Sequence, residues 1–505
     1  MSHHTYVELI LDALAADRAR QAVTDADGRT VTAGAFHDDV HRTAAELAEH
    51  GIGRGATVAL LTGDRPEALT ARYAANLLGA RVVFLYEGMA ARTLAAVLAS
   101  VEPSALLVDP TLPGSGRRSG AAARTGRAVL RPEPVRRGPD GAFAAAHGRL
   151  VARRRGRRTT GASVTRAAPP ASPGVRMAHG PYARTFVEGQ GLGGDPAPCF
   201  LVCTSLAHLS GIIADHVLWA GGRLVIQRSF VPAEVLAAVE RERITDLWLL
   251  PPLLYRLLDE PTLAGTDLSS LRRVMYGGTA ASAARLRQAI EVFGPVLNGF
   301  YGQSEAGLIT AVAPAEHGVT GRAGRSRRAV RCPGGRGDPG HERPSGRAGR
   351  VRRDHGAHPQ LMSGYWKQPE LTAEVLTDGW VRTGDVGYLD GAGHLFIVDR
   401  IKEMIVVVGA MCTPPSWRNC CSPTRRWRTA RCSGARRGRY RGGAGGGRPG
   451  GRAPRGPGVA AVVRHGAQGP DVRPSALYVV DRIPLTTAGK PDRQRLRALP
   501  TADAG

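Results

Sequence analysis

The chain has 505 residues, of which 43% are apolar, and a formal net charge of +25. This length and apolar content are sufficient for a large domain plus a smaller one. No stretch of about 18 apolar residues predicts a membrane-spanning helix. Glu8 and Asp12 lie among the first apolar residues, which is unlike a signal peptide, so we expect a cytoplasmic protein.

The positive charge is concentrated in three arginine-rich ranges. Residues 111–176 hold 15 Arg and 2 acidic residues, residues 321–357 hold 11 and 3, and residues 412–472 hold 13 and 1. These ranges contain almost no aromatic residues for base stacking, so we expect no nucleic-acid partner, although a basic nucleic-acid-binding protein remains an alternative. They lack helical or strand periodicity, and we expect them to be disordered and translated out of frame from a GC-rich gene.

Helical and strand patterns alternate between Tyr6 and Asp109. The sequence predicts helices over 36–50, 65–78 and 93–100, and strands over 56–61, 81–85 and 105–108. The alternation resumes later, with strands over 199–203, 223–226, 245–250 and 273–278, and helices over 233–241, 252–258 and 282–293. Strands separated by helices of this length favour parallel sheets with crossover helices, so the predicted fold class is α/β.

A short apolar run, Gly294–Leu297, leads into the segment Asn298-Gly-Phe-Tyr-Gly-Gln-Ser-Glu305. We expect a strand end followed by a tight turn that carries four candidate ligand-binding residues. Tyr301 can offer its ring to a base, Gly302 allows backbone to approach that base, Ser304 can bond a phosphate oxygen, and Glu305 can hold Mg²⁺.

Three further segments follow in order: Trp380-Val-Arg-Thr-Gly-Asp385, Val398-Asp-Arg-Ile-Lys-Glu-Met-Ile405 and Pro484-Leu-Thr-Thr-Ala-Gly-Lys-Pro491. Together with the Tyr301 segment they resemble the adenylate-forming superfamily, that is, the acyl-CoA synthetases and their adenylation-domain and luciferase relatives. The resemblance implies a large N-terminal domain of βα units over residues 1–398. It also implies a small α+β C-terminal domain over residues 399–505, joined by a hinge.

The resemblance also implies roles for individual residues. Asp385 and Arg400 would bind the ribose and phosphate of ATP, and the glycine pair Gly277–Gly278 would approach the adenine and the acyl pocket. Lys402 would be the hinge of the small domain. Two catalytic roles complete the set: His208 would flank the acyl pocket, and Lys490 would bridge the α-phosphate and the attacking carboxylate.

The family's phosphate-binding loop is incomplete in this sequence. Gly174–Gly180 resembles its tail, but the Gly-Thr-Thr-Gly core and the lysine are missing. A neighbouring frame of residues 165–174 can encode Ala-Gly-Gly-Thr-Thr-Gly-Val-Pro, which contains the core of the phosphate-binding loop. Restoring one base in the codon of Met411 gives a sequence with a helix and a strand that is similar to the family's C-terminal domain. The frame hypothesis therefore predicts where the missing elements were lost.

The implied activity is that of an ATP- and Mg²⁺-dependent acyl-CoA ligase, which activates a carboxylic acid as an acyl-adenylate and transfers the acyl group to CoA. One alternative is an adenylating enzyme that loads the phosphopantetheine of an acyl carrier protein. Another is an inactive product of a damaged gene. The sequence does not indicate which acid would be used.

Overall fold

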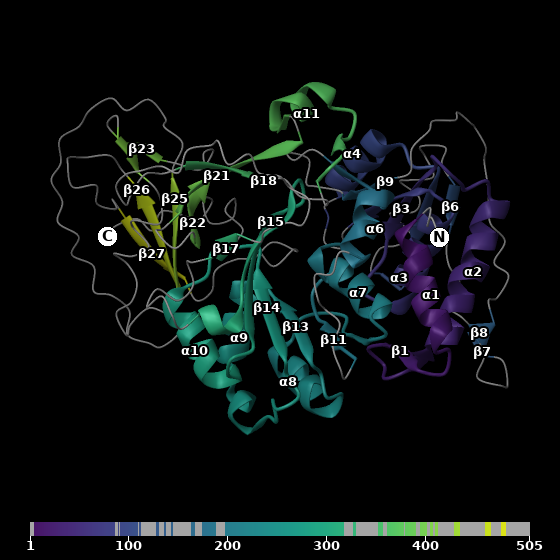
Figure 1. Cartoon of the computed structure of the whole chain (residues 1–505), viewed down its shortest axis with the longest axis horizontal. Coiled ribbons are helices and arrows are strands. Elements are labelled where there is room, and N and C mark those ends of the chain that lie inside the picture. The colour runs from purple at the N-terminus through teal and green to yellow at the C-terminus, as the bar shows by residue number, and fades with distance from the viewer. Residues whose placement is uncertain are drawn as a thin grey trace.

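The computed structural model describes residues 5–85, 89, 91–109, 111–112, 174–187, 197–317, 361–377, 379–389 and 394–400, together with short strands between and beyond these ranges. Among these residues, no helix combines the length and apolar character that crossing a bilayer requires. Figure 1 shows the N-terminal helices α1 to α3 at one side of the picture and the last strands, β23 to β27, at the other.

The first sheet has a parallel centre and an antiparallel extension. Its strand order is β18-β21-β22-β17-β16-β15-β14-β13-β11-β12-β1-β2, with β20 beside β21. Strands β1, β11, β12, β13, β14 and β15 pair in parallel, whereas β16 pairs antiparallel with β15. The bounds are β1 Gln21–Thr24, β2 Thr30–Thr32, β11 Cys199–Val202, β12 Arg223–Ile226, β13 Asp246–Leu249, β14 Arg273–Gly277, β15 Leu297–Gln303, β16 Gly307–Val312, β17 Arg327–Ala329, β18 Arg352–Gly356, β20 Leu376–Thr377, β21 Trp380–Leu389 and β22 His394–Arg400.

The second sheet has the order β19-β10-β9-β4-β3-β5-β6 and is parallel from β9 to β6. Its bounds are β3 Thr57–Leu61, β4 Arg81–Leu85, β5 Ala105–Val108, β6 Ala128–Leu130, β9 Ser163–Arg166, β10 Val175–Ala178 and β19 Gly364–Tyr365. Smaller sheets are formed by β7 Arg136–Arg137, β8 Phe143–Ala144, β23 Ile405–Val407, β24 Ala410–Cys412, β25 Thr429–Gly434, β26 Ala460–His465 and β27 Ala476–Val480.

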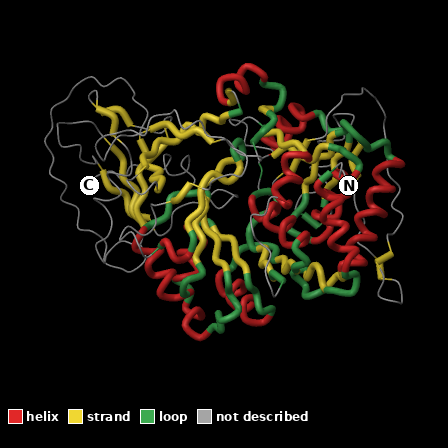
Figure 2. Tube along the Cα trace, viewed as in Figure 1, coloured by secondary structure: helices red, strands yellow, loops and turns green. Residues whose placement is uncertain are grey.

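The helices cover the sheets (Figure 2). Their bounds are α1 Tyr6–Ala16, α2 Ala33–Glu49, α3 Pro66–Leu77, α4 Ala91–Val101, α6 His179–Val187, α7 Leu209–Trp219, α8 Pro232–Arg241, α9 Pro251–Leu258, α10 Ala283–Phe293 and α11 Pro369–Val375. Helix α2 begins three residues before its predicted start because the Thr32 hydroxyl accepts a hydrogen bond from Ala35 N and caps the helix. Proline at the first turn of α3, α8 and α9 fixes their starts.

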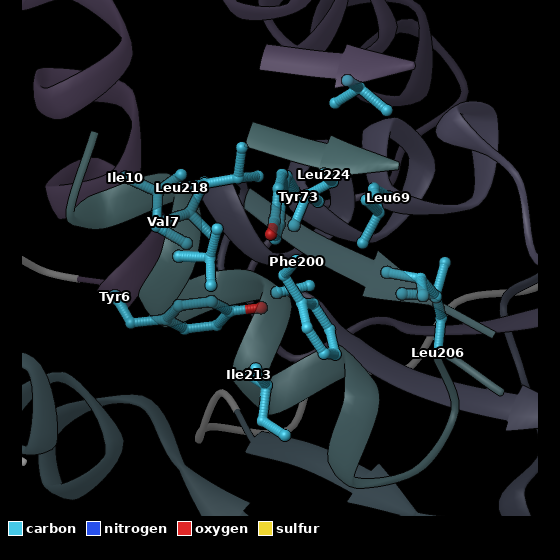
Figure 3. Packing of buried hydrophobic residues seen from close by; sticks show 14 of the residues in the cluster. Tyr6, Val7, Ile10, Leu69, Tyr73, Phe200, Leu206, Ile213, Leu218 and Leu224 are labelled. Atoms are coloured by element: carbon cyan, nitrogen blue, oxygen red, sulfur yellow. The ribbon is translucent and has the colours of Figure 1, made fainter. Parts of the chain in front are cut away.

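The largest core cluster joins the two sheets. It combines residues of α1 and α3 with residues of α7, β11 and β12, including Tyr6, Leu69, Phe200, Ile213 and Leu224 (Figure 3). These side chains come from segments that are up to about 200 positions apart in the sequence, and each is almost fully buried. Their burial removes apolar surface from water and holds the two sheets together.

A buried polar centre lies within this interface. The Asp215 carboxylate of α7 forms an ion pair with Arg72 of α3 and accepts hydrogen bonds from Tyr73 Oη at 2.6 Å and Tyr182 Oη at 2.8 Å. Arg72 and Asp215 side chains are 6% and 2% exposed. Because three donors satisfy one carboxylate, this centre fixes the register between α3 and α7.

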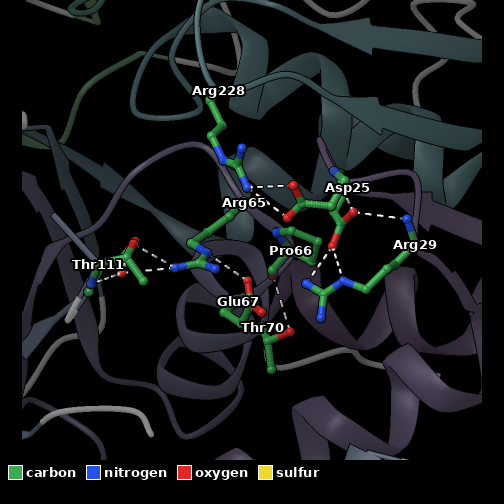
Figure 4. Close-up of polar contacts among 10 residues, drawn as sticks. Asp25, Arg29, Arg65, Pro66, Glu67, Thr70, Thr111 and Arg228 are labelled. Carbon is green, nitrogen blue, oxygen red and sulfur yellow. Dashed lines mark hydrogen bonds and ion pairs between the residues drawn. The ribbon is translucent and has the colours of Figure 1, made fainter. Parts of the chain in front are cut away.

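Polar contacts at the surface fix the loops between elements (Figure 4). Arg65, which precedes α3, donates to Asp109 at 2.9 Å and Thr111 at 3.1 Å, so it links the start of α3 to the end of β5. Asp25 accepts hydrogen bonds from Arg29 Nε at 2.6 Å and from the backbone of the β1–β2 turn. These contacts fix the β1–β2 turn and tie the loop before α3 to the end of β5.

The structure corrects one prediction for the central segment. Tyr301 and Gly302 were expected to lie with Ser304 and Glu305 in a tight turn after a strand end, but β15 extends through Gln303, and the turn comprises residues 304–306. The extension has a tertiary cause: β16 folds back and pairs with β15 from Gly299 to Gln303, with a bulge between Tyr301 and Gly302. The backbone groups of Tyr301 and Gly302 are therefore part of the sheet.

Short strands also lie inside the arginine-rich ranges. Strands β6 and β9 lie within 111–176, β17 and β18 within 321–357, and β25 and β26 within 412–472. Sheet pairing uses backbone groups, which every non-proline residue supplies, so strands can form in segments without apolar periodicity. Residues 111–112, β7, β8, 174–176 and Cys412 are also described, and for the rest of each range, which lies outside the described residues, the expectation of disorder stays a prediction.

Candidate active site

The carboxyl ends of the parallel strands β11, β13, β14 and β15 meet at one edge of the first sheet. In such sheets ligands bind in the crevice at this edge. The turns that follow these strands hold His208, Gly278, Ser304 and Glu305. The structure therefore gathers at one edge residues that the sequence placed almost 100 positions apart.

The glycine pair is required by the packing of β14 against its neighbour. A Cβ on Gly277 would lie 2.4 Å from Phe300 O, and Gly278 has a φ of +77°. A side chain at Gly277 would push β14 away from β15, and one at Gly278 would be strained. The pair thus keeps the backbone exposed at the end of β14, where a flat ligand could approach.

Tyr276, just before this pair, is fixed by a histidine that the sequence analysis did not identify. Tyr276 Oη and His317 Nε2 are 3.1 Å apart, and His317 Nδ1 lies 2.9 Å from Ala313 O. Burial lowers the pKa of His317 below its ordinary value, so this ring is held neutral. The pair links the end of β14 to the segment that follows β16.

Tyr301 and Asp385 lie together although they are 84 residues apart in the sequence. Tyr301 Oη donates to Asp385 Oδ2 at 2.6 Å, and Gln303 Nε2 donates to the same oxygen at 2.6 Å. Asp385 is 3% exposed and its backbone lies opposite that of Arg400 in the β21–β22 ladder. Two neutral donors thus orient the carboxylate that would bind ribose.

Gly302 has a structural requirement of its own. A Cβ at this position would lie 2.3 Å from Gly307 O across the β15–β16 hairpin. The close approach of the two strands therefore demands glycine here, whether or not a ligand base also lies against it. Ser304 begins the half-buried turn that follows.

Glu305 lies in the turn after β15 and connects to the second sheet. Tyr365 Oη donates to Glu305 Oε1 at 3.2 Å, and Met362 N donates to Glu305 O at 2.9 Å. Burial and the nearby carboxylate raise the pKa of the Tyr365 hydroxyl above its ordinary value, so the hydroxyl remains a donor at neutral pH.

Glu305 supplies a carboxylate of the kind that Mg²⁺ takes from a protein. In the described part of the chain, no group of three His, Cys, Asp or Glu side chains could hold a metal ion. Mg²⁺ is usually bound by one or two carboxylates, several waters and the phosphates of a nucleotide. A single half-buried carboxylate at the sheet edge satisfies that requirement.

His208 is the N-cap residue of α7, after the end of β11. Its backbone N donates to Ser205 O at 3.0 Å, and its own carbonyl accepts from Gly211 N at 3.1 Å. Leu206 N in the same loop donates to Asp64 Oδ1 at 2.8 Å, which ties the loop to the second sheet. His208 therefore lies at the same edge as the glycine pair.

Several predicted site residues cannot be placed as side chains. Lys402 and Lys490 lie outside the described residues, and for Arg400 only the backbone in β22 is described. Residues 167–173, where the core of the phosphate loop is expected, also lie outside them. The predicted domain boundary after Val398 falls within β22 and stays a prediction.

Besides His317, sequence reasoning missed Gln303 and Tyr365. Gln303 stands inside the segment already singled out, between Tyr301 and Ser304. Tyr365 belongs to the segment Leu361–Glu370, which resembles the family without interruption. Neither role could be read from sequence alone because both residues bond side chains more than 50 positions away.

Residues 12–145 and 174–366 match the family model described as AMP-binding enzyme. The chain belongs to this family. The match is interrupted at residues 146–173, inside the first arginine-rich range, and continues across 321–357. The interruption coincides with the place where the phosphate-loop core is missing.

Two curated relatives and one solved structure illustrate the similarity. The chain is 34% identical over 332 residues to a medium/long-chain-fatty-acid–CoA ligase of Mycobacterium tuberculosis, covering 60% of this chain and 54% of the relative. It is 35% identical over 225 residues to a fatty acid–[acyl-carrier-protein] ligase of Streptomyces coeruleorubidus, covering 42% and 43%. The fold is similar to that of the amide bond synthetase McbA from Marinactinospora thermotolerans, with a TM-score of 0.75, 28% identity and 98% of each chain covered.

The chain thus spans about half the length of these two curated relatives. The solved structure, by contrast, matches over nearly the whole chain. The family and the adenylate-forming α/β fold are therefore established.

Proposed function

We propose that this chain, with its reading frames intact, is an AMP-forming acid–thiol ligase that activates a carboxylic acid with ATP and transfers the acyl group to CoA. The observation that carries this proposal is the gathering of Tyr301, Asp385 and Glu305 at the edge where β11 to β15 end. Family membership and the names of the relatives support the same reaction class.

In the first half-reaction, a carboxylate oxygen of the acid attacks the α-phosphorus of ATP, and pyrophosphate leaves. Asp385, oriented by Tyr301 and Gln303, would bond the ribose hydroxyls, and the Gly277–Gly278 backbone would lie against the adenine and the acyl group. Glu305 would hold Mg²⁺, which neutralises phosphate charge when bound.

In the second half-reaction, the thiol attacks the acyl carbon and AMP leaves. Lys490 would serve the first step by bridging the α-phosphate and the carboxylate, and rotation at Lys402 would then replace it with the thiol channel. His208 would flank the acyl group, and Arg400 would contact the ribose or phosphate. These four assignments rest on the resemblance of their segments to the family, and the small domain would comprise residues 399–505.

The test is ATP–pyrophosphate exchange with a panel of carboxylic acids. It compares the 505-residue chain with a version whose frames are restored over 111–176, 321–357 and 412–472. We expect exchange only in the restored protein, because the chain lacks the phosphate-loop core. Exchange by neither protein would overturn the proposal and favour an inactive gene product.

The acceptor is decided by a second assay. CoA, a holo-carrier protein and an amine are offered in turn to the acyl-adenylate, because relatives include a carrier-protein ligase and an amide bond synthetase. We expect the CoA thioester. Retention on DNA that weakens steeply with salt would instead support the basic nucleic-acid-binding alternative. We also propose a cytoplasmic location, where ATP and CoA are available.

A further inference from the structure

The strand that carries Tyr365 is bonded on two sides. Strand β19 pairs antiparallel with β10, with Tyr365 opposite Val175. Ser363 N donates to Arg176 O at 2.8 Å, and Trp366 N donates to Gly174 O at 2.8 Å. The segment from Ser363 to Trp366 is therefore fixed to the strand that begins where the phosphate-loop tail is predicted.

The other contacts of this segment reach the first sheet. Met362 N donates to Glu305 O, and Tyr365 Oη donates to Glu305 Oε1. Tyr365 is 8% exposed, and its backbone N donates to Thr372 Oγ1 at 2.9 Å. A phenol held by its ring, its backbone and its strand has little freedom, so its hydroxyl can fix the carboxylate that it bonds.

We propose that Tyr365 is a positioning residue for Glu305, whose hydroxyl holds the carboxylate in the orientation that binds the metal of a metal–nucleotide complex. Through β19 and β10, it also keeps this carboxylate in register with the strand that follows the phosphate loop. The inference rests on the proposed function, because it takes Glu305 as the metal ligand. Tyr365 itself would touch neither the metal nor the nucleotide.

The alternative is a structural role, in which the Tyr365 hydroxyl merely satisfies a polar group in the core. The two roles predict different results for Tyr365→Phe, which keeps the ring and removes the hydroxyl. A structural role lowers stability without changing metal binding. A positioning role weakens metal binding specifically, because the freed carboxylate must be ordered by the metal.

The experiment measures Mn²⁺ binding by electron paramagnetic resonance in the presence of ATP, since Mn²⁺ accepts the same oxygen ligands as Mg²⁺. It uses the full 505-residue chain and its frame-restored form. For Tyr365→Phe we expect about five- to tenfold weaker metal affinity, unchanged affinity for metal-free ATP, and unchanged maximal pyrophosphate exchange at saturating Mg²⁺. The matched control is Tyr6→Phe, which also removes a buried hydroxyl, bonded to Asn76 Oδ1 at 2.9 Å, and should leave metal affinity unchanged.

The outcomes separate the inference from the proposed function. Exchange and metal binding that are unchanged in Tyr365→Phe would overturn the positioning role and leave the ligase proposal standing. Absence of both exchange and metal–nucleotide binding in the frame-restored parent chain would overturn the ligase proposal and this inference with it.

A second variant covers the case in which Tyr365→Phe does not fold. Replacement of Tyr365 by 4-fluorophenylalanine fills the space of the hydroxyl with fluorine, which keeps the packing of the ring but cannot donate a hydrogen bond to Glu305 Oε1. Weaker Mn²⁺ binding with unchanged affinity for metal-free ATP supports the positioning role, and unchanged Mn²⁺ binding overturns it.

Discussion

The buried histidine at the start of α6 should make the protein sensitive to acid. His179 is 4% exposed, its ring stacks on that of Tyr6 with centroids 5.6 Å apart, and neither ring nitrogen has a hydrogen-bond partner among the described residues. Burial lowers the pKa of His179 from its ordinary value of 6.5 to about 4. The folded protein therefore holds this ring neutral at a pH where the unfolded chain already binds a proton.

The change in the free energy of unfolding with pH follows from the difference between the folded and unfolded pKa of His179. Because the folded pKa lies below the unfolded one, this contribution to the free energy of unfolding is present above pH 6.5 and is lost as the pH falls toward 4. The full loss is about 3 kcal/mol, since one unit of pKa corresponds to about 1.4 kcal/mol. Between pH 7 and pH 5 the loss is about 2 kcal/mol.

The substitution His179→Phe should remove this loss. It keeps an aromatic ring beside Tyr6 and replaces two buried nitrogens that have no hydrogen-bond partner among the described residues. At pH 7 we therefore expect a free energy of unfolding equal to that of the parent or about 1 kcal/mol higher. Urea unfolding at pH 7 and pH 5, followed by tryptophan fluorescence, measures both quantities. Trp219 reports on this cluster because it packs edge-on against Phe186 at 5.7 Å.

The matched control is His216→Phe, at a histidine that does have partners. His216 Nδ1 lies 2.9 Å from Ile212 O and Nε2 lies 3.2 Å from Thr185 Oγ1, so the same substitution should cost about 1–3 kcal/mol at pH 7. Other acid-sensitive groups are present in both the parent and His179→Phe. Their effect cancels when the change in the free energy of unfolding between pH 7 and pH 5 is compared for the two proteins. If His179→Phe loses as much stability as the parent between pH 7 and pH 5, the ring is not the acid-sensitive group.

Three further predictions follow. Asp215→Asn should lower the free energy of unfolding in urea by about 3–5 kcal/mol, because it leaves Arg72 buried without its charge partner. The control Asp27→Asn, in the exposed ion pair with Arg228, should change it by less than about 0.5 kcal/mol. Equal changes in the two variants would contradict the role of the buried centre. In the frame-restored protein, Lys490→Ala should abolish acyl-adenylate formation and spare thioester formation from supplied acyl-adenylate, and equal loss in both half-reactions would remove its adenylating role. Glu305→Gln should abolish Mg²⁺-dependent pyrophosphate exchange with an unchanged urea midpoint, and undiminished exchange would exclude it as the metal ligand.

Local patterns were sufficient for much of the α/β fold. The predicted strands over 56–61, 81–85 and 223–226 and the predicted helices over 233–241 and 282–293 agree with β3, β4, β12, α8 and α10 to within one or two residues. Helix α7 was missed because it is buried on most sides, so its sequence Leu209–Trp219 shows no single apolar stripe. Strands β1 and β2 were missed because they are short and are held by pairing with each other and with β12.

The sequence by itself determined the family and the residue types of the site, because glycine pairs, a tyrosine and carboxylates at fixed positions form continuous segments that need no knowledge of contacts. Only the tertiary structure decided what these residues bond: Tyr301 with Asp385, and Glu305 with Tyr365. It also decided that β15 extends through Gln303, since the pairing strand β16 supplies the hydrogen bonds. Hydrogen bonds between distant segments depend on which strands pair and on how the two sheets pack, and apolar periodicity within one segment encodes neither.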